Sequence, residues 1–130
     1  MKILQPPGWP RPRGYSNGIV ARGTFVVLSG IVGWNAEERF ETDDFAGQAA
    51  QALRNIVALL DEAGAKPDHL VRLTWYITSR DAYLAARKPL GAVWREIIGT
   101  HYPAMAIVEV SGLIEARARL EIEATAVIPG

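Results

Sequence analysis

Two stretches near the C-terminus decide the fold: HYPAMAIVEV at residues 101–110 and RLEIEATAVI at residues 119–128. Each is rich in β-branched residues and bounded by Pro, Gly or a polar break, which predicts a β-strand. Alternate side chains of a strand share one face. These sets are Met105, Ile107 and Glu109 in the first strand, and Glu121, Glu123 and Thr125 in the second.

The carboxylates at every second position of the last strand indicate a face that is solvated or that lines an interface or a site. Two interpretations are open. In the first, the glutamates pair with Arg72, Arg117 or Arg119 in a structural network of ion pairs. In the second, they belong to a functional site, where carboxylates with shifted pKa values are common.

Length and composition exclude some classes of domain organisation and of function. The length predicts one domain over residues 1–130, which begins with an extended, Pro-rich lead-in at residues 1–14 that supplies no regular ladder. Fourteen basic side chains balance fourteen acidic ones, so no cationic surplus attracts nucleic acid. There is no cysteine, and His69 and His101 lie far apart, so neither a metal site nor a cofactor is expected.

No apolar run approaches the roughly 20 residues that cross a bilayer. No membrane association is therefore expected, and the expected location is the cytoplasm.

The first half of the chain predicts two strands and a helix. Strands at residues 15–23 and 24–30 are expected to form a hairpin, and the nearly continuous apolar run of the second predicts burial on both faces. Glycines at 30 and 33 let the backbone bend or approach a ligand closely. A helix is expected from Thr42 or Asp43 to Gly64, because apolar residues recur there at helical spacing.

The second half predicts a strand at residues 69–78, with Leu70 on the same face as Arg72, and a helix from Ser79 to Ile98. Pro89 should kink or split that helix between residues 87 and 92. The order ββ-α-β-α-ββ predicts an α+β fold with two helices on one face of a mixed sheet. The opposite face stays half polar, which favours a homo-oligomer packed sheet to sheet.

Short motifs run in order along nearly the whole chain. They include Gly14-Tyr15-Ser16-Asn17, Leu28-Ser29-Gly30, Pro103-Ala104, Val108-Glu109-Val110 and Glu121-Ile122-Glu123-Ala124. Together these motifs resemble the RidA/YjgF family. That resemblance implies a chorismate-mutase-like α+β fold and a homotrimer with a central barrel. It also implies that a small molecule binds in each cleft between subunits, where relatives hydrolyse enamines and imines such as 2-aminoacrylate to 2-oxo acids and ammonia.

The resemblance also implies site residues. Tyr15, Ser29 and Gly30 match binding positions, and Glu121 matches the glutamate that positions or deprotonates the attacking water. The family places an arginine directly after Pro-Ala, where it grips the substrate carboxylate, but this chain has Met105. A charged hydrogen bond of roughly 1.5–3 kcal/mol is thereby lost. We expect a substrate that lacks the free α-carboxylate.

Two features could restore ligand binding. Arg87 either brings charge into the cleft or is an ordinary surface arginine. Trp34, with Tyr15, Met105 and Ile107, either lines an apolar cleft for a larger or aromatic substrate or belongs to the core.

Three functions remain open at this stage. The first is a hydrolase of an imine, an enamine or a related C–N substrate, with Glu121 as its base. The second is a trimeric module that binds a small molecule without turnover. The third, an endoribonuclease or translation inhibitor, is disfavoured by the balanced charge.

Overall fold

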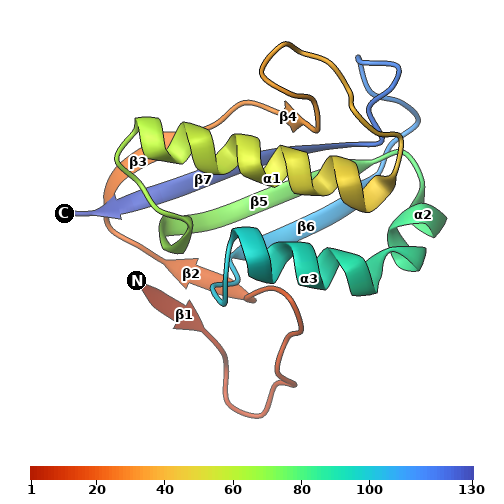
Figure 1. Ribbon diagram of the computed structural model, residues 1–130. Helices are drawn as coiled ribbons and strands as arrows, with labels where there is room; N and C mark the ends of the chain where they lie inside the picture. The colour runs from red at the N-terminus through yellow and green to blue at the C-terminus, as the bar shows by residue number, and fades with distance from the viewer.

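A mixed five-stranded sheet carries two long helices on one face (Figure 1). The computed structural model describes residues 1–130. Strand β5 is parallel to β6, and all other pairs are antiparallel. The order across the sheet is β3-β7-β5-β6, with β4 also on β7, and the strands are β3 (Gly23–Val27), β4 (Ile31–Val32), β5 (Leu70–Ile77), β6 (Ala104–Glu109) and β7 (Leu120–Pro129).

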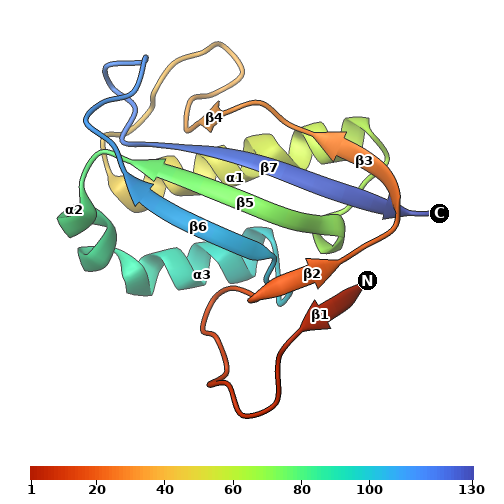
Figure 2. The same cartoon turned by 180° about the vertical axis from the view of Figure 1, so that it is seen from behind.

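The helices lie on the same side of this sheet. They are α1 (Phe45–Glu62), α2 (Arg80–Ala85) and α3 (Arg87–Ile97), with a 3₁₀ turn, η1 (Pro67–His69), before β5. Seen from behind, the sheet has no helix over it (Figure 2). The predicted α+β architecture, with its helices on one face, is confirmed. None of the helices is long and apolar enough to cross a membrane.

Helix α1 begins at Phe45, slightly later than predicted, because Asp44 is the residue that caps it. The Asp44 carboxylate accepts a hydrogen bond from the Gly47 amide at 2.9 Å, which satisfies one of the free donors of the first turn. Residues 42 and 43 therefore precede the helix. Its buried stripe packs on the sheet and comprises Phe45, Ala49, Ala52, Leu53, Ile56 and Leu60.

The end of α1 is at the predicted place. Gly64 has a φ of +76°, a left-handed conformation that glycine adopts without steric cost. Its amide donates to the Asp61 carbonyl at 3.0 Å, and the Ala65 amide donates to the Leu60 carbonyl at 2.8 Å. This pair of bonds is the Schellman arrangement that satisfies the last carbonyls of a helix.

The second predicted helix is split, as Pro89 indicated. It divides into α2 and α3 at Ala86, one residue before the predicted interval. Pro89 then lies in the first turn of α3, where a missing amide donor costs no intrahelical bond. Ser79 caps α2, since its hydroxyl accepts from the Ala82 amide at 3.0 Å.

Strand β5 contradicts one detail of the predicted alternation. Leu70 was expected on the face of Arg72, but it is fully buried in the core. The pairing with β7 shifts register between these two residues. Leu70 is therefore buried in the core, although strict alternation along the strand would place it on the face of Arg72.

The N-terminal predictions need correction. Residues 2–4 of the expected lead-in form strand β1 (Lys2–Leu4), which pairs antiparallel with β2 (Gly18–Val20) in a separate two-stranded sheet. The expected hairpin between the next two strands is also wrong, because β2 pairs with β1 and β3 pairs with β7.

Strand β3 is not buried on both faces in the single chain. Phe25 is 68% exposed and Val27 is 73% exposed. Both residues lie opposite Val127 and Thr125 of β7 on the face that the helices leave uncovered. The apolar run of β3 therefore supplies an exposed apolar edge to the open face.

Candidate functional site

The acidic face of β7 lies on the open side of the sheet. Tyr76 of β5 donates its hydroxyl hydrogen to Oε1 of Glu123 at 2.7 Å. That bond raises the pKa of Tyr76, with smaller contributions from burial and from the charges of Glu123 and Glu121, and Arg72 acts in the opposite sense.

The proposed network between these glutamates and arginines is absent. The only ion pair joins Arg117 to Asp43, at 2.9 Å. The interpretation of the acidic face as a set of structural ion pairs is therefore wrong. No group of three or more His, Asp or Glu side chains lies close enough to hold a metal ion.

Glu121 is held directly against the backbone at Gly30. A Cβ added to Gly30 would lie 2.4 Å from Oε2 of Glu121, so a larger residue at position 30 would force this carboxylate to move. The antiparallel pairing of Val32 with Glu121 brings the two segments together. The structure thus places the predicted Glu121 and Gly30 side by side.

Ser29, Gly30 and Trp34 line one cavity of about 370 Å³ between the segment around β4 and α1. The Trp34 carbonyl accepts from Nδ2 of Asn55 at 2.7 Å, which ties this loop to the helix. The Trp34 ring packs on Phe40, with centroids 5.8 Å apart, and lies outside the core cluster. Trp34 is therefore a cavity wall and not a core residue. Glu121 lines neither this cavity nor the two described next.

A second cavity, of about 250 Å³, lies between α3 and β6. We call it the α3–β6 cavity. Met105 and Ile107 project into it from β6, and Arg87 lines it from the start of α3. Arg87 thus contributes charge to the same cavity as Met105. The complete lining is Gly14, Trp75, Tyr83, Arg87, Leu90, Gly91, Trp94, Arg95, Tyr102, Met105 and Ile107.

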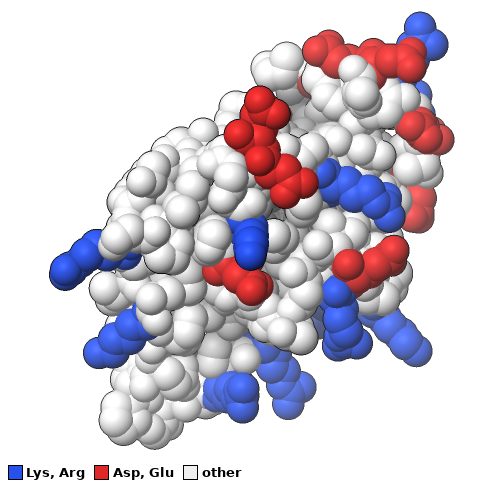
Figure 3. Space-filling model, turned by 60° about the vertical axis from the view of Figure 1, so that its left-hand side comes forward, with Lys and Arg blue, Asp and Glu red and all other residues white.

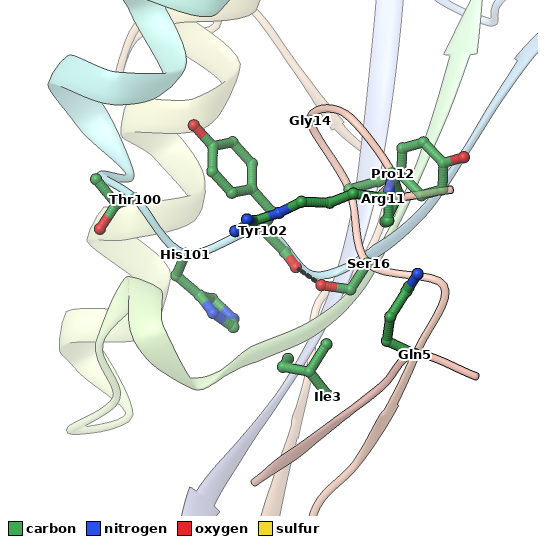
Figure 4. Close-up of a pocket in the computed structure, with 10 residues that line it drawn as sticks. Ile3, Gln5, Arg11, Pro12, Gly14, Ser16, Thr100, His101 and Tyr102 are labelled. Carbon is green, nitrogen blue, oxygen red and sulfur yellow. Dashed lines mark hydrogen bonds between the residues drawn. The ribbon is translucent and has the colours of Figure 1, made fainter. Parts of the chain in front are cut away.

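Tyr15 lines a third cavity, of about 670 Å³, beneath the N-terminal segment (Figure 4). This cavity shares Gly14 and Tyr102 with the α3–β6 cavity, so the two adjoin. The Ser16 hydroxyl donates to the Tyr102 carbonyl, and this bond holds the N-terminal segment beside the start of β6 (Figure 4). Arg11 reaches into the same space.

One chain does not bring Met105 and Glu121 together. Met105 lies beside Leu73 of β5 on the helix side of the sheet, whereas Glu121 lies beside Tyr76 on the open side. Strand β5 also separates β6 from β7. The predicted site residues therefore fall into two groups on opposite faces, with Tyr15 near the first group and Ser29, Gly30 and Trp34 near the second.

Comparison with known proteins identifies the family. The family model "Endoribonuclease L-PSP", which describes the RidA/YjgF proteins, matches residues 10–128. This chain is a member of the RidA/YjgF family.

Several members resemble this RidA-family chain over most of its length. A 2-iminobutanoate/2-iminopropanoate deaminase of Dermatophagoides farinae is 30% identical over 98% of this chain and 96% of its own. A RutC family protein of Aquifex aeolicus is 37% identical over 60% of this chain and 62% of its own. The structure of the Rid-family protein YyfB from Yersinia pestis superimposes with a TM-score of 0.84, at 30% identity over 98% of both chains.

Sequence reasoning missed most of the α3–β6 cavity in this RidA-family protein. The available signal was the spacing along α3, because residues at i, i+3, i+4, i+7 and i+8 share one side of a helix. A second signal was the parallel pairing of Trp75 with Ile107, but that pairing is visible only in the sheet. The missed residues are Trp75, Tyr83, Leu90, Trp94, Arg95 and Tyr102.

Proposed function

We propose that this RidA-family chain forms a homotrimer that hydrolyses an imine, an enamine or a related C–N substrate lacking a free α-carboxylate. The observation that carries the proposal is the Glu121 carboxylate, half-buried against Gly30 on the open side of the sheet. Relatives about 30% identical that are named 2-iminobutanoate/2-iminopropanoate deaminases support imine chemistry.

In the proposed reaction, Glu121 accepts a proton from a water molecule while the water oxygen bonds to the imine carbon. The electron pair of the C=N bond moves to nitrogen, which takes the proton held by Glu121 and gives a neutral carbinolamine. Glu121 then takes the hydroxyl proton of the carbinolamine and passes it to nitrogen while the oxygen electron pair forms the C=O bond. The C–N bond breaks, and a carbonyl compound and ammonia or an amine leave. An enamine first takes a proton on carbon and becomes the imine. A positioned general base contributes roughly 10²–10⁴-fold to such a rate.

The separation of the two residue groups supports a site shared between subunits, and we propose that the assembly is a homotrimer. The helix-side cavity and the open-side carboxylate face away from each other within one chain. A cleft that joins the cavity of one protomer to Glu121 of the next would complete the site. The exposed Phe25 and Val27 offer apolar surface for that assembly, which we propose to be closed around a central barrel.

Two variants test the role of Glu121. Glu121→Gln should reduce turnover at least about 100-fold and leave ligand affinity within a fewfold, because the amide keeps the shape and loses the base. Glu123→Gln is the matched control, since Glu123 lies on the same face and bonds only Tyr76. The assay measures ammonia or amine release from imines of aliphatic and aromatic amines. Full activity in Glu121→Gln would refute the proposal.

A second candidate is a trimeric module that binds a small molecule without turnover. One observation favours it: within the single chain, Glu121 lines none of the three cavities that contain the other predicted site residues. In that case the wild-type protein binds ligand, releases no ammonia from any imine of the panel, and behaves like Glu121→Gln.

Ribonuclease activity has less support, although the family description names it. Figure 3 shows acidic and basic side chains together on one face, with basic ones gathered toward its lower edge and no continuous basic track. A nuclease assay on protein free of contaminating RNases tests this third function.

A further inference from the structure

We infer that the α3–β6 cavity binds an aromatic, or similarly flat and apolar, molecule that carries an anionic group. The walls of the cavity fit a ring. Trp94 and Tyr102 lie nearly parallel, with centroids 6.1 Å apart and planes 14° from each other. Met105 and Ile107 cover the sheet side with apolar surface. Flat aromatic walls and a soft thioether favour an aromatic or aliphatic body over a strongly hydrated one.

The charge of the lining selects an anion. Arg87 and Arg95 both line the cavity, and no acidic side chain does. The two arginines are eight residues apart in sequence, which places them on the same side of the helix. Neither has an acidic partner, because the one ion pair of the chain joins Arg117 to Asp43. A carboxylate or phosphate at this rim would face two guanidinium groups with no competing anion.

The donors of the lining point to the same ligand chemistry. Nε1 of Trp75 is the only buried side-chain polar atom without a hydrogen-bond partner, and Trp75 is 4% exposed. An indole N–H only donates, so its missing partner must be an acceptor. Burial raises the pKa of Tyr83, an effect that Arg87 opposes, and the phenol therefore stays protonated near neutral pH and can also donate. An acceptor-rich ligand can accept from the Tyr83 hydroxyl, and it reaches the Trp75 indole N–H when the groups that cover this atom move aside.

The size of the cavity limits the body of the ligand to about one ring. Benzene enters a cavity of about 150 Å³, and this one measures about 250 Å³. Gly91 lines it, and a Cβ on Gly91 would meet no atom within 4 Å, so the helix leaves open space at this point. A single ring with a short charged arm fits these dimensions.

The inference that the α3–β6 cavity binds such a molecule does not depend on hydrolysis. That the molecule is also a substrate rests on the proposed function. As a substrate it would carry its anionic group at Arg87 and Arg95 on the helix side. The relatives' arginine grips a carboxylate at position 105 instead, a contact that Met105 cannot make. The inferred substrate class is thus an aryl or similar imine whose negative charge lies away from the reacting carbon.

Phenylacetate and its neutral isostere phenylacetamide test the inference by calorimetry on the full chain. Phenylacetate should bind at least about tenfold more tightly than the amide, and more weakly as salt rises. Arg87→Gln with Arg95→Gln should weaken phenylacetate binding about tenfold, because both contacts are partly solvated. The matched control is Lys88→Gln, which removes one adjacent exposed positive charge outside the cavity and should leave Kd within about twofold.

Two further variants separate shape from charge. Gly91→Leu keeps both arginines and should abolish phenylacetate binding by filling the open space, with an unchanged circular dichroism spectrum as the check on folding. Trp75→Phe should weaken binding about threefold by removing the buried donor. An unchanged Kd in Trp75→Phe would overturn the role of the indole N–H. An unchanged Kd in the double arginine variant, or equal binding of acid and amide, would overturn the inference.

The outcomes also separate this inference from the proposed function. Phenylacetate binding without hydrolysis of any imine would refute only the proposed function. If the protein hydrolyses neutral imines, and phenylacetate neither binds to the protein nor inhibits that hydrolysis, only the inference is refuted.

Discussion

At the scale of single residues, we propose that position 105 determines which substrates the cavity accepts. Met105 follows the Pro-Ala pair, projects to the helix side of β6 and lies against the core cluster. Its thioether offers apolar contact and no donor, so position 105 supplies no partner for a carboxylate next to the reacting carbon of a small 2-imino acid. The wild-type protein should therefore not accelerate pyruvate formation from a system that generates 2-aminoacrylate.

Met105→Arg should restore that activity, because a guanidinium at this position supplies the bidentate contact that the family uses. The expected gain is about tenfold or more in the rate of pyruvate formation, measured with lactate dehydrogenase as the coupling enzyme. Met105→Leu conserves volume without charge and should stay inactive. Clear activity in the wild-type protein, or none in a folded Met105→Arg variant, would contradict the specificity argument.

Single positions also show what the sequence reveals of a site. Glu121 and Gly30 were predicted because their motifs are local, and the structure places them in contact. The unsatisfied Nε1 of Trp75 was not predictable, since its lack of a partner depends on every neighbour that the fold brings near. Arg95 was missed for the same reason, because a helical arginine is ordinary until a cavity lies beside it.

At the scale of elements, local periodicity was sufficient for the helices and for the last three strands. The apolar stripe, the Schellman end of α1 and the split at Pro89 all follow from nearby residues. Strand pairing does not, because β3 joins β7 across about a hundred residues and β2 joins β1 instead of β3. The predicted hairpin failed on that long-range choice.

Gln48 links α1 to the segment before β7. Its side chain is fully buried, donates to the carbonyls of Thr42 and Arg117 at 3.0 Å, and accepts from the Arg119 amide at 2.8 Å. Gln48→Leu fills the space but leaves these backbone groups unsatisfied. We expect a loss of about 3 kcal/mol in the free energy of unfolding, measured with urea.

Gln51→Leu is the control for that change. Gln51 lies one turn further along α1 and is only partly buried, and its side chain makes one bond, to Asn55. Its replacement should cost less than about 1 kcal/mol. Equal losses in the two variants would show that the network of Gln48 contributes nothing beyond an ordinary side-chain contact.

At the scale of the whole molecule, the open face of the sheet should control assembly. Val27 is 73% exposed beside Phe25 on β3, where a partner sheet would cover both. Val27→Glu introduces charge there and should dissociate the proposed homotrimer to monomers, because burying an unpaired carboxylate is strongly unfavourable. Light scattering coupled to size-exclusion chromatography measures the mass directly.

Leu84→Glu provides the comparison. Leu84 is also an exposed apolar residue, at 40%, but it lies on α2, on the helix side of the sheet. Its replacement should leave the assembly intact. A wild-type monomer, or a Val27→Glu protein that remains a trimer, would contradict assembly through the open face.

The placement of Glu121 and the α3–β6 cavity on opposite faces has a consequence for mixtures of two variants. If each cleft takes its acid from one chain and its cavity from another, a Glu121→Gln chain and a Gly91→Leu chain carry complementary defects. We expect that neither variant hydrolyses the substrate when it is alone. Unfolded together and refolded as a mixture, they form rings in which some clefts combine the intact halves, so two inactive proteins yield an active one.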